Sequence, residues 1–381
     1  MKIVYFSHSL RSDWNHGNAH FLRGVASELV ERGHDVQVLE PRDAWSVQNL
    51  VAEWGESALE EWKQFYPLLA HSSTRYELET LNLEAALEDA DLVIVHEWND
   101  HDLVARIGQH RKNHAYKLLF HDTHHRAVTE RASLAKYNLE NYDGVLAFGQ
   151  VIRDLYLQNQ WTRRAWTWHE AADTRIFYPM RNDEYGTMNE EAAASSFISH
   201  PSSFVGDLVW IGNWGDDERT RELHEFLLEP VKELGLKARV HGVRYPDQAK
   251  TALRESGIEY SNWLPNYRAP AVFAQFKVTV HVPRRPYVES LPGIPTIRPF
   301  EALACGIPLV SAPWNDCEHL FSPGEDFLVA RHGEEMKHQL RRVLNEPQLA
   351  QSLVQHGLKT IQARHTCAHR VDELLSIYNE L

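Results

Sequence analysis

The first forty residues, MKIVYFSHSLRSDWNHGNAHFLRGVASELVERGHDVQVLE (1–40), decide the fold class. Residues 3–9 form a β-branched and aromatic run that predicts a strand. Between 19 and 31 the apolar residues recur at helical spacing, and Gly33 can end that helix in a left-handed cap. A second strand is expected at 36–39. This order of strand, helix and strand predicts a parallel sheet that is covered by helices on both faces.

The same alternation continues along the chain, while residues 45–88 are expected to be mostly helical. Further strands of the first half are expected at 91–96, 117–121, 144–148 and 165–168. Strands of the second half are expected at 204–210, 238–243, 277–282, 308–311 and 326–329. These patterns predict an α/β protein with two Rossmann-like, doubly wound parallel-sheet domains.

The expected domain boundaries follow from where this rhythm stops and restarts. The first domain is expected at 1–179 and the second at 204–355, joined by a small and polar linker or insertion at 180–203. Apolar residues at helical spacing in 356–381 predict C-terminal helices that pack back across both domains. Ligands of such sheets bind at the carboxyl ends of the strands, so a cleft between the domains is the expected site.

The composition restricts the partners and the cellular location that we expect for the protein. With 39 Lys and Arg against 53 Asp and Glu, the net charge is −14, which argues against nucleic acid or an anionic membrane as a partner. The three cysteines form no CxxC pair, so we expect a reducing, cytoplasmic location and no thiolate metal site. No apolar stretch approaches the roughly 20 residues that span a bilayer. The surplus of 12 Trp and 23 His predicts polar and aromatic surfaces that line a site.

Two common phosphate-binding motifs are missing from the sequence. The loop after the first strand offers a single glycine, Gly17, instead of GxGxxG, and GxxxxGK[ST] does not occur. Both a dinucleotide site and a P-loop are therefore disfavoured. The cleft is expected to hold a different ligand.

The most informative stretch is PGIPTIRPFEALACGIPLVSAP (292–313). Thr296 can cap a short helix, and Glu301 is expected in its first turn, with the helix N-terminus facing the cleft. A carboxylate there can accept hydrogen bonds from a vicinal diol, while Arg298 and the free helix amides suit a phosphate. The alternative is that Glu301 only complements the helix dipole.

The segment PFEALACGIPLVS (299–311) resembles the nucleotide-sugar signature of GT-B glycosyltransferases, in particular the retaining family-four type and its CgeB-like branch. Similar matches lie at 17–36, 169–179 and 209–220, in the expected order. The resemblance implies that Glu301 binds the donor ribose. The family's second glutamate, which lies beside the transferred sugar, is replaced here by Gly293.

Further donor-binding residues are expected around the loop that follows the first strand of the second domain. Gly212, Asn213, Trp214 and Gly215 suit a close backbone approach to a diphosphate, with Trp214 free to pack on a base or sugar. Among the arginines that could neutralise the diphosphate, Arg298 and Arg244 rank ahead of Arg219, Arg268, Arg284 and Arg285. The complete expected donor set is Glu301, Arg298, Thr296, Phe300, Arg244 and Gly212–Gly215.

The segment FHDTHHRA (120–127) ends a predicted strand and carries several polar side chains. A metal site is one interpretation, although side chains diverge at such a turn, and no metal is expected. The resemblance instead implies that His121 contacts the transferred sugar, and the expected catalytic residues are His121, Asp122 and His124. The expected acceptor or cleft residues are His16, Gly17, Asn18, Glu97 and His125.

The sequence as a whole predicts a glycosyltransferase that moves a sugar from a nucleotide diphosphate to an acceptor hydroxyl, with retention and without a cofactor. The donor base (UDP, GDP or dTDP) stays open. The acceptor is expected to be a glycan, a protein or a small molecule, and the protein a monomer or homodimer. Alternatives are a non-catalytic binding or coat protein, a sugar-nucleotide epimerase of the same fold, and a metal-dependent hydrolase built on His121–His125.

Overall fold

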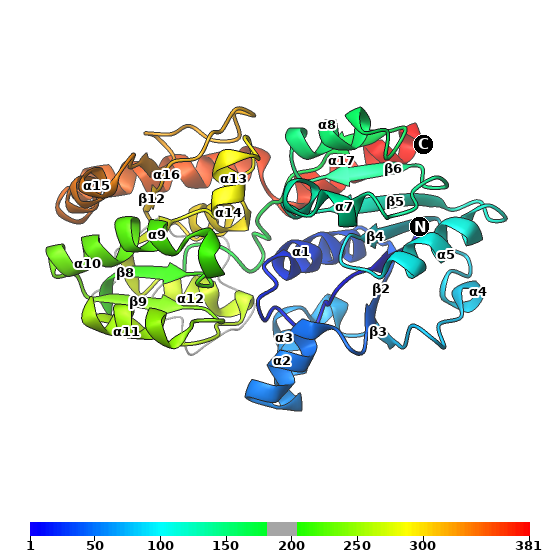
Figure 1. Cartoon of the computed structure of the whole chain (residues 1–381), viewed down its shortest axis with the longest axis horizontal. Coiled ribbons are helices and arrows are strands. Elements are labelled where there is room, and N and C mark those ends of the chain that lie inside the picture. Colours follow the sequence, from blue (N-terminus) through cyan, green and yellow to red (C-terminus); the bar gives the residue numbers. More distant parts are fainter. Residues whose placement is uncertain (181–203) are drawn as a thin grey trace.

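The computed structural model describes residues 1–180 and 204–381. The chain forms two α/β domains that lie side by side (Figure 1). Apart from residue 180, the predicted linker at 180–203 lies outside the described residues. Within the described ranges, no helix combines the length and hydropathy that a membrane span requires.

The first domain is built on a parallel sheet of seven strands in the order β3-β2-β1-β4-β5-β6-β7. These strands are β1 (Lys2–Phe6), β2 (Asp35–Pro41), β3 (Ser73–Tyr76), β4 (Leu92–His96), β5 (Lys117–Asp122), β6 (Gly144–Ala147) and β7 (Ala165–Thr167). In β1, Ile3 and Tyr5 pack into one hydrophobic cluster, and Val4 and Phe6 into another. Both faces of the sheet are therefore buried, as continuous apolar strands require.

Helices cover both faces of this sheet. They are α1 (Asn18–Glu31), α2 (Trp45–Trp54), α3 (Trp62–Phe65), α4 (Leu83–Ala86), α5 (His101–Arg111), α6 (Arg126–Thr129), α7 (Arg131–Leu134) and α8 (Gln150–Gln158). Helix α1 is followed by Arg32 and then by Gly33, whose φ of +82° is the left-handed conformation expected from the sequence.

The second domain has a parallel sheet of six strands in the order β10-β9-β8-β11-β12-β13. Its strands are β8 (Gly206–Ile211), β9 (Ala238–His241), β10 (Ile258–Tyr260), β11 (Phe276–His281), β12 (Leu309–Ser311) and β13 (Leu328–Val329). Its helices are α9 (Thr220–Leu223), α10 (Glu229–Leu234), α11 (Asp247–Glu255), α12 (Ala269–Phe273), α13 (Arg285–Glu289), α14 (Ile297–Ala304), α15 (Gly333–Asn345) and α16 (Pro347–Arg364).

Two strands are absent from the sequence-based prediction. Strand β3 lies inside the segment 45–88 that is expected to be mostly helical, and β10 was assigned to no element. Both are edge strands of three or four residues with polar side chains. Such short edge strands carry little of the apolar pattern that identifies a buried strand.

The end of the chain returns to the first domain. Helix α17 (Cys367–Glu380) packs against α1, and Figure 1 shows it in red beside α8 and β6. The backbone carbonyl of Arg370 accepts a hydrogen bond of 2.8 Å from Nε1 of Trp168. Residues Ala172 and Thr366 form an isolated parallel bridge.

The two domains also contact each other directly. The carboxylate of Asp13, in the loop after β1, accepts hydrogen bonds from Nε1 of Trp263 at 3.0 Å and from the backbone N–H of Asn266 at 3.1 Å. Arg23 holds the same carboxylate at 2.8 Å. The interface is therefore fixed by buried polar groups as well as by apolar packing.

Candidate active site at the domain interface

The loops that follow the carboxyl ends of strands from both sheets meet at the interface. Asn213, after β8, donates a hydrogen bond to the side-chain oxygen of Asn15, after β1. His125, after β5, lies 3.7 Å from Glu218, in the turn after β8. The carboxyl ends of parallel strands are where ligands of open α/β sheets bind. The candidate site is therefore built from both domains.

Glu301 lies at this interface in the centre of α14 and is fully buried. Its Oε1 is 2.8 Å from Nδ1 of His20, on α1 of the other domain, and its Oε2 contacts Arg298. The backbone N–H of Asp173 donates to Nε2 of His20, so the ring proton lies on Nδ1 and is donated to Glu301. Both carboxylate oxygens are engaged by protein groups in this structure.

The position of Glu301 within α14 corrects the sequence prediction. The helix begins at Ile297, so Glu301 lies in the second turn and not in the first. Thr296 stands at the N-cap position, but its side chain makes no capping hydrogen bond and its φ is +63°. Glu301 is thus placed by its contact with His20, and not by the helix dipole, whose effect fades beyond the first turn.

Arg219 lies directly after the turn that follows β8, and its surroundings favour the binding of a ligand. Its guanidinium donates to the backbone carbonyls of Asn213, Trp214 and Val282, and it lies 5.0 Å from the centre of the Trp210 ring. Within the described residues Arg219 forms no ion pair with a carboxylate, whereas Arg284 is paired with Glu218 at 2.9 Å and Arg298 with Glu301. Two of the five N–H donors of a guanidinium remain for another ligand.

Other cations surround Arg219. Removal from water, reinforced by the charges of Arg284 and Arg298, lowers the pKa of Arg219 to about 9. The same loss of water, with Arg219 and Arg298 nearby, lowers the pKa of His281 to about 3. His281 lies at the end of β11. Its Nδ1 forms a hydrogen bond with the hydroxyl of Ser311, and its buried Nε2 has no partner among the described residues. These three residues, Arg219, Arg284 and Arg298, are called the arginine group below. They could hold an anion, and Arg219 is the member without a carboxylate partner among the described residues.

The predicted diphosphate loop lies beside the arginine group. Gly215 has a φ of +82°, and a Cβ there would lie 2.8 Å from Nε of Arg219. The oxygen of the Asn213 amide accepts from the backbone N–H of Val243 at 3.1 Å, which fixes the loop. A Cβ at Gly212 would lie 2.7 Å from the Trp210 ring. Both glycines are needed because the loop packs closely on Arg219 and Trp210.

Three predicted donor residues do not fit that role. The indole of Trp214 is buried in the core of the second domain and its Nε1 donates to Thr220, so it is not free for a base. Phe300 is buried against Phe321. Arg244 is exposed, has a φ of +60°, and is paired with Asp216 at 2.8 Å. Apolar burial and an existing carboxylate partner take these side chains away from a ligand.

Four histidines line the first-domain side of the interface. His8, His16, His96 and His121 follow one another with ring centres 5.0, 6.4 and 5.5 Å apart. His8 and His16 come from the loop between β1 and α1, and His96 and His121 from the ends of β4 and β5. This histidine row, as we call it, explains part of the histidine surplus in the composition.

The histidine row is buried and uncharged. Burial lowers the pKa of His8 to about 4 and that of His121 to about 3, and lowers the pKa values of His16 and His96 well below their usual range. Each ring keeps one buried nitrogen without a hydrogen-bond partner among the described residues. Unpartnered buried nitrogens are costly, so a ligand that hydrogen bonds to these four nitrogens could remove that cost.

Comparison with known proteins agrees with this architecture. Residues 219–376 match the family model described as "Glycosyl transferase-like". This match begins after β8 and ends within α17. A search of curated proteins found no match. The more specific resemblance to the CgeB-like branch stays a prediction.

Solved structures match the whole chain, with low sequence identity. Sucrose-phosphate synthase from Thermosynechococcus elongatus has a TM-score of 0.65 at 14% identity, over 100% of this chain and 98% of that one. Anabaena HepE in complex with UDP has a TM-score of 0.63 at 12% identity, over 100% of both chains. An alpha-glucosyltransferase in complex with UDP has a TM-score of 0.66 at 11% identity, over 99% of both chains. The chain has the GT-B fold of these transferases.

The remaining first-domain predictions divide into two sets. Gly17 is exposed at the interface, and a Cβ there would lie 3.4 Å from Ile297. Asn18 contacts Glu170 at 3.5 Å. His124 is half-buried, with its ring 4.0 Å from that of His125. These residues border the interface, as do His16 and His121.

Asp122 and Glu97 form the second set and have structural roles. Asp122 is fully buried and accepts hydrogen bonds from the Tyr156 hydroxyl at 2.8 Å and from the backbone N–H of His124 at 3.1 Å. Glu97, also fully buried, accepts from the backbone N–H of Thr123. Burial raises the pKa of Asp122 to about 6, and burial next to Asp122 raises the pKa of Glu97 well above its usual range. The predicted catalytic role of Asp122 does not fit, because its oxygens hold the loop.

Two further carboxyl groups, Glu170 and Glu318, lie at the interface and are not among the predicted catalytic, donor or acceptor residues. Glu170 is buried, and burial together with the nearby Glu301 raises its pKa to about 8. Glu318 accepts hydrogen bonds of 2.8 Å from the backbone N–H of Gln150 and from Nε2 of His169. A Cβ at Gly293 would lie 2.5 Å from Oε1 of Glu318, so this carboxylate occupies the space beside Gly293. No sequence spacing links Glu318 to Gly293, because they lie in different loops.

Proposed function

We propose that this protein transfers a sugar from a UDP-sugar to an acceptor hydroxyl, with retention of configuration and without a metal. The observation that carries the proposal is Arg219, a guanidinium without a carboxylate partner in the described residues, next to Arg284 and Arg298. Diphosphate fits such a group because guanidinium donors match phosphate oxygens. UDP is the proposed nucleotide because two structural neighbours were solved with it.

The arginine group has a direct chemical task in this reaction. As the bond between the anomeric carbon and the diphosphate oxygen breaks, the electron pair goes to the diphosphate. Positive groups already in place stabilise that charge in the transition state. In the retaining route, the acceptor oxygen forms its bond on the same face, and its proton passes to the leaving phosphate oxygen. Arginines supply the charge compensation in place of a metal ion.

The histidine row is the proposed partner of the uncharged part of the reactants. A neutral imidazole nitrogen donates or accepts a hydrogen bond and adds no charge. Sugar and acceptor hydroxyls need such partners, whereas a phosphate needs cations. His121, at the end of β5, is the proposed contact to the transferred sugar, with Gly17 and His124 on the acceptor side.

Glu318 is the proposed replacement for the glutamate that the family resemblance places at position 293. Its carboxylate lies against Gly293, 2.5 Å from the position of a Cβ. It reaches this place from the loop after β12 and is held by His169 of the first domain. A carboxylate is thus present beside the proposed sugar position, although it comes from another loop.

The proposed acceptors are a glycan, a protein side chain or a small molecule, acted on by a monomer or homodimer. The net charge of −14 argues against nucleic acid. One structural neighbour, an alpha-glucosyltransferase, was solved with UDP and a 13-mer DNA. DNA is therefore included among the acceptors in the test below.

The proposal is tested by binding and turnover of UDP-, GDP- and dTDP-sugars, with and without EDTA. We expect UDP to raise the unfolding temperature, since a ligand of the native state stabilises it. We also expect slow hydrolysis of a UDP-sugar that EDTA does not change. Glu318→Gln should reduce turnover and leave UDP affinity unchanged, while the exposed control Glu325→Gln should change neither. If none of the three nucleotides binds, the proposal fails and a non-catalytic role of the fold is favoured.

A further inference from the structure

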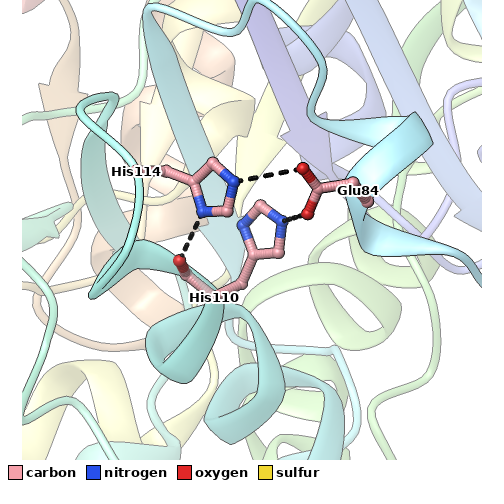
Figure 2. A group of neighbouring side chains, drawn as sticks. All are labelled: Glu84, His110 and His114. Carbon is pink, nitrogen blue, oxygen red and sulfur yellow. Dashed lines mark hydrogen bonds and ion pairs between the residues drawn. The ribbon is translucent and has the colours of Figure 1, made fainter.

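A second cluster of polar side chains lies on the first domain, away from the domain interface. Figure 2 shows Glu84, on α4, opposite the rings of His110, on the last turn of α5, and His114, which follows that helix. Oε2 of Glu84 is 3.2 Å from Nε2 of His110, and Oε1 is 3.4 Å from Nε2 of His114. Within the described residues this is the one group of three or more His, Cys, Asp or Glu side chains whose ligand atoms all lie within 4.8 Å of one another.

The hydrogen bonds of the two rings define where their protons lie. Nδ1 of His114 is 2.7 Å from the backbone carbonyl of His110, which can only accept. Nδ1 of His110 is 3.1 Å from the hydroxyl of Tyr116, which donates its own proton to the carbonyl of Ile107. Both Nδ1 atoms therefore carry a proton. In the neutral rings, both Nε2 lone pairs point at the Glu84 carboxylate.

With both rings neutral, this arrangement has no positive charge between its three groups. Two lone pairs that face a carboxylate repel it, so the three groups are stabilised only by a cation between them or by protons on Nε2. The two rings are stacked, with centres 3.8 Å apart and planes 2° apart. Two imidazolium cations at that separation repel each other. A single shared cation satisfies all three side chains at once.

We propose that Glu84, His110 and His114 bind one divalent transition-metal ion of the zinc type, with water as the fourth ligand. Bonds of about 2.0–2.1 Å in a tetrahedron place neighbouring ligand atoms about 3.3–3.4 Å apart. The two measured nitrogen-to-oxygen distances, 3.2 and 3.4 Å, are of this size, and each involves a different oxygen of Glu84. Imidazole together with carboxylate suits Zn²⁺.

The same hydrogen bonds complete the second shell of the site. A ring nitrogen that donates to a carbonyl or hydroxyl fixes the tautomer that presents the other nitrogen to a metal. Because the ring planes are parallel, the shared ion requires one ring to tilt. His114 can do so, since it follows the end of α5 at Arg111 and is about one-third exposed.

The position of the site assigns it a structural role. His114 lies just before β5 begins at Lys117, at the amino end of the sheet, whereas the proposed active site lies at the carboxyl ends. The ion would tie α4 to the end of α5, and the two elements are far apart in sequence. This role is independent of the proposed sugar transfer, which uses no metal.

The test is a titration of the chelator-treated full-length protein with Zn²⁺ by calorimetry, and with Co²⁺ by visible absorption. We expect one site, with the intense absorption of tetrahedral Co²⁺ and a Zn²⁺-dependent rise in unfolding temperature. The double variant Glu84→Gln/His114→Gln should weaken this site at least tenfold and lose the Co²⁺ band. The exposed His356→Gln on α16 is the matched control and should bind as the wild type does. Absence of stoichiometric binding in the wild type, or equal binding and an equal Co²⁺ band in the double variant, would overturn the proposal.

Discussion

The two sides of the domain interface differ in the charge of their side chains. On the first-domain side, burial keeps the imidazoles of the histidine row neutral. On the second-domain side, Arg219 keeps its charge at neutral pH, although loss of water lowers its pKa to about 9. A guanidinium stays protonated where an imidazole does not. From this difference we expect an anionic diphosphate to bind beside the arginines and uncharged hydroxyl groups to bind beside the histidines.

The largest expected effect concerns the histidine row at acid pH. The unfolded chain takes up a proton on each imidazole near pH 6.5, whereas the folded rings resist protonation down to a pH of about 3 for His121. The unfolded state therefore binds more protons below pH 6.5, and the free energy of unfolding falls as the pH falls from there. His96→Gln/His121→Gln should reduce this dependence by up to about 2.8 kcal/mol per pH unit, or about 1.4 for each group, a limit that is reached near pH 5.

Urea unfolding between pH 5 and 7 measures this slope. His356→Gln serves as the control, because His356 is exposed and bonds within α16. A double variant with the wild-type slope would show that the row is not neutral in the folded protein, and the contrast with the arginine group would be lost.

The next effect concerns Arg219. Arg219→Gln removes a charged donor pair from the proposed diphosphate site, and a hydrogen bond to a charged group contributes about 1.5–3 kcal/mol. The affinity for UDP should fall roughly 10- to 100-fold. Calorimetry with UDP checks this, with Arg285→Gln as the control, since Arg285 is paired with Glu222. Unchanged affinity in the folded Arg219 variant would remove the anion-binding role.

The smallest expected effect concerns Glu170. Burial raises the pKa of this carboxyl group, whereas it lowers the pKa of the histidines, so the two kinds of group change the free energy of unfolding with opposite signs as the pH rises. Its folded pKa is raised to about 8, so the stabilisation is full below pH 4.5 and is lost as the pH rises through 8. Glu170→Gln imitates the protonated form and should remove this loss, by up to about 1.4 kcal/mol per pH unit. Thermal unfolding between pH 5 and 9 measures it, with the exposed Glu140→Gln as control. An identical pH profile in Glu170→Gln would contradict a protonated Glu170.

Much of the fold could be predicted from the sequence, because buried parallel strands are continuous apolar runs. The strand 117–121 is an example, since β5 covers Lys117–Asp122. Strands β3 and β10 could not be found in this way, because each is a short edge strand that buries few side chains. Whether a strand lies at the edge depends on the arrangement of the whole sheet, so it cannot be predicted from the local sequence.

The candidate site was predictable only in part. The motif around Glu301 and the strand end at His121 located the interface. The roles of Trp214 and Phe300 depended on burial, and the ranking of Arg219 below Arg244 depended on which arginine has a carboxylate neighbour. Glu318 reaches Gly293 from another loop. Burial and pairing between distant segments are spatial facts, so residue type and spacing could not supply them.

The most direct test of the two-sided site is a crystal structure of the protein with UDP. The account predicts the diphosphate within hydrogen-bond distance of the Arg219 guanidinium, between the Gly212–Gly215 loop and Arg298, with no phosphate oxygen on the histidine row. A diphosphate bound to His96 or His121, with Arg219 contacting only its present carbonyl partners, would contradict it.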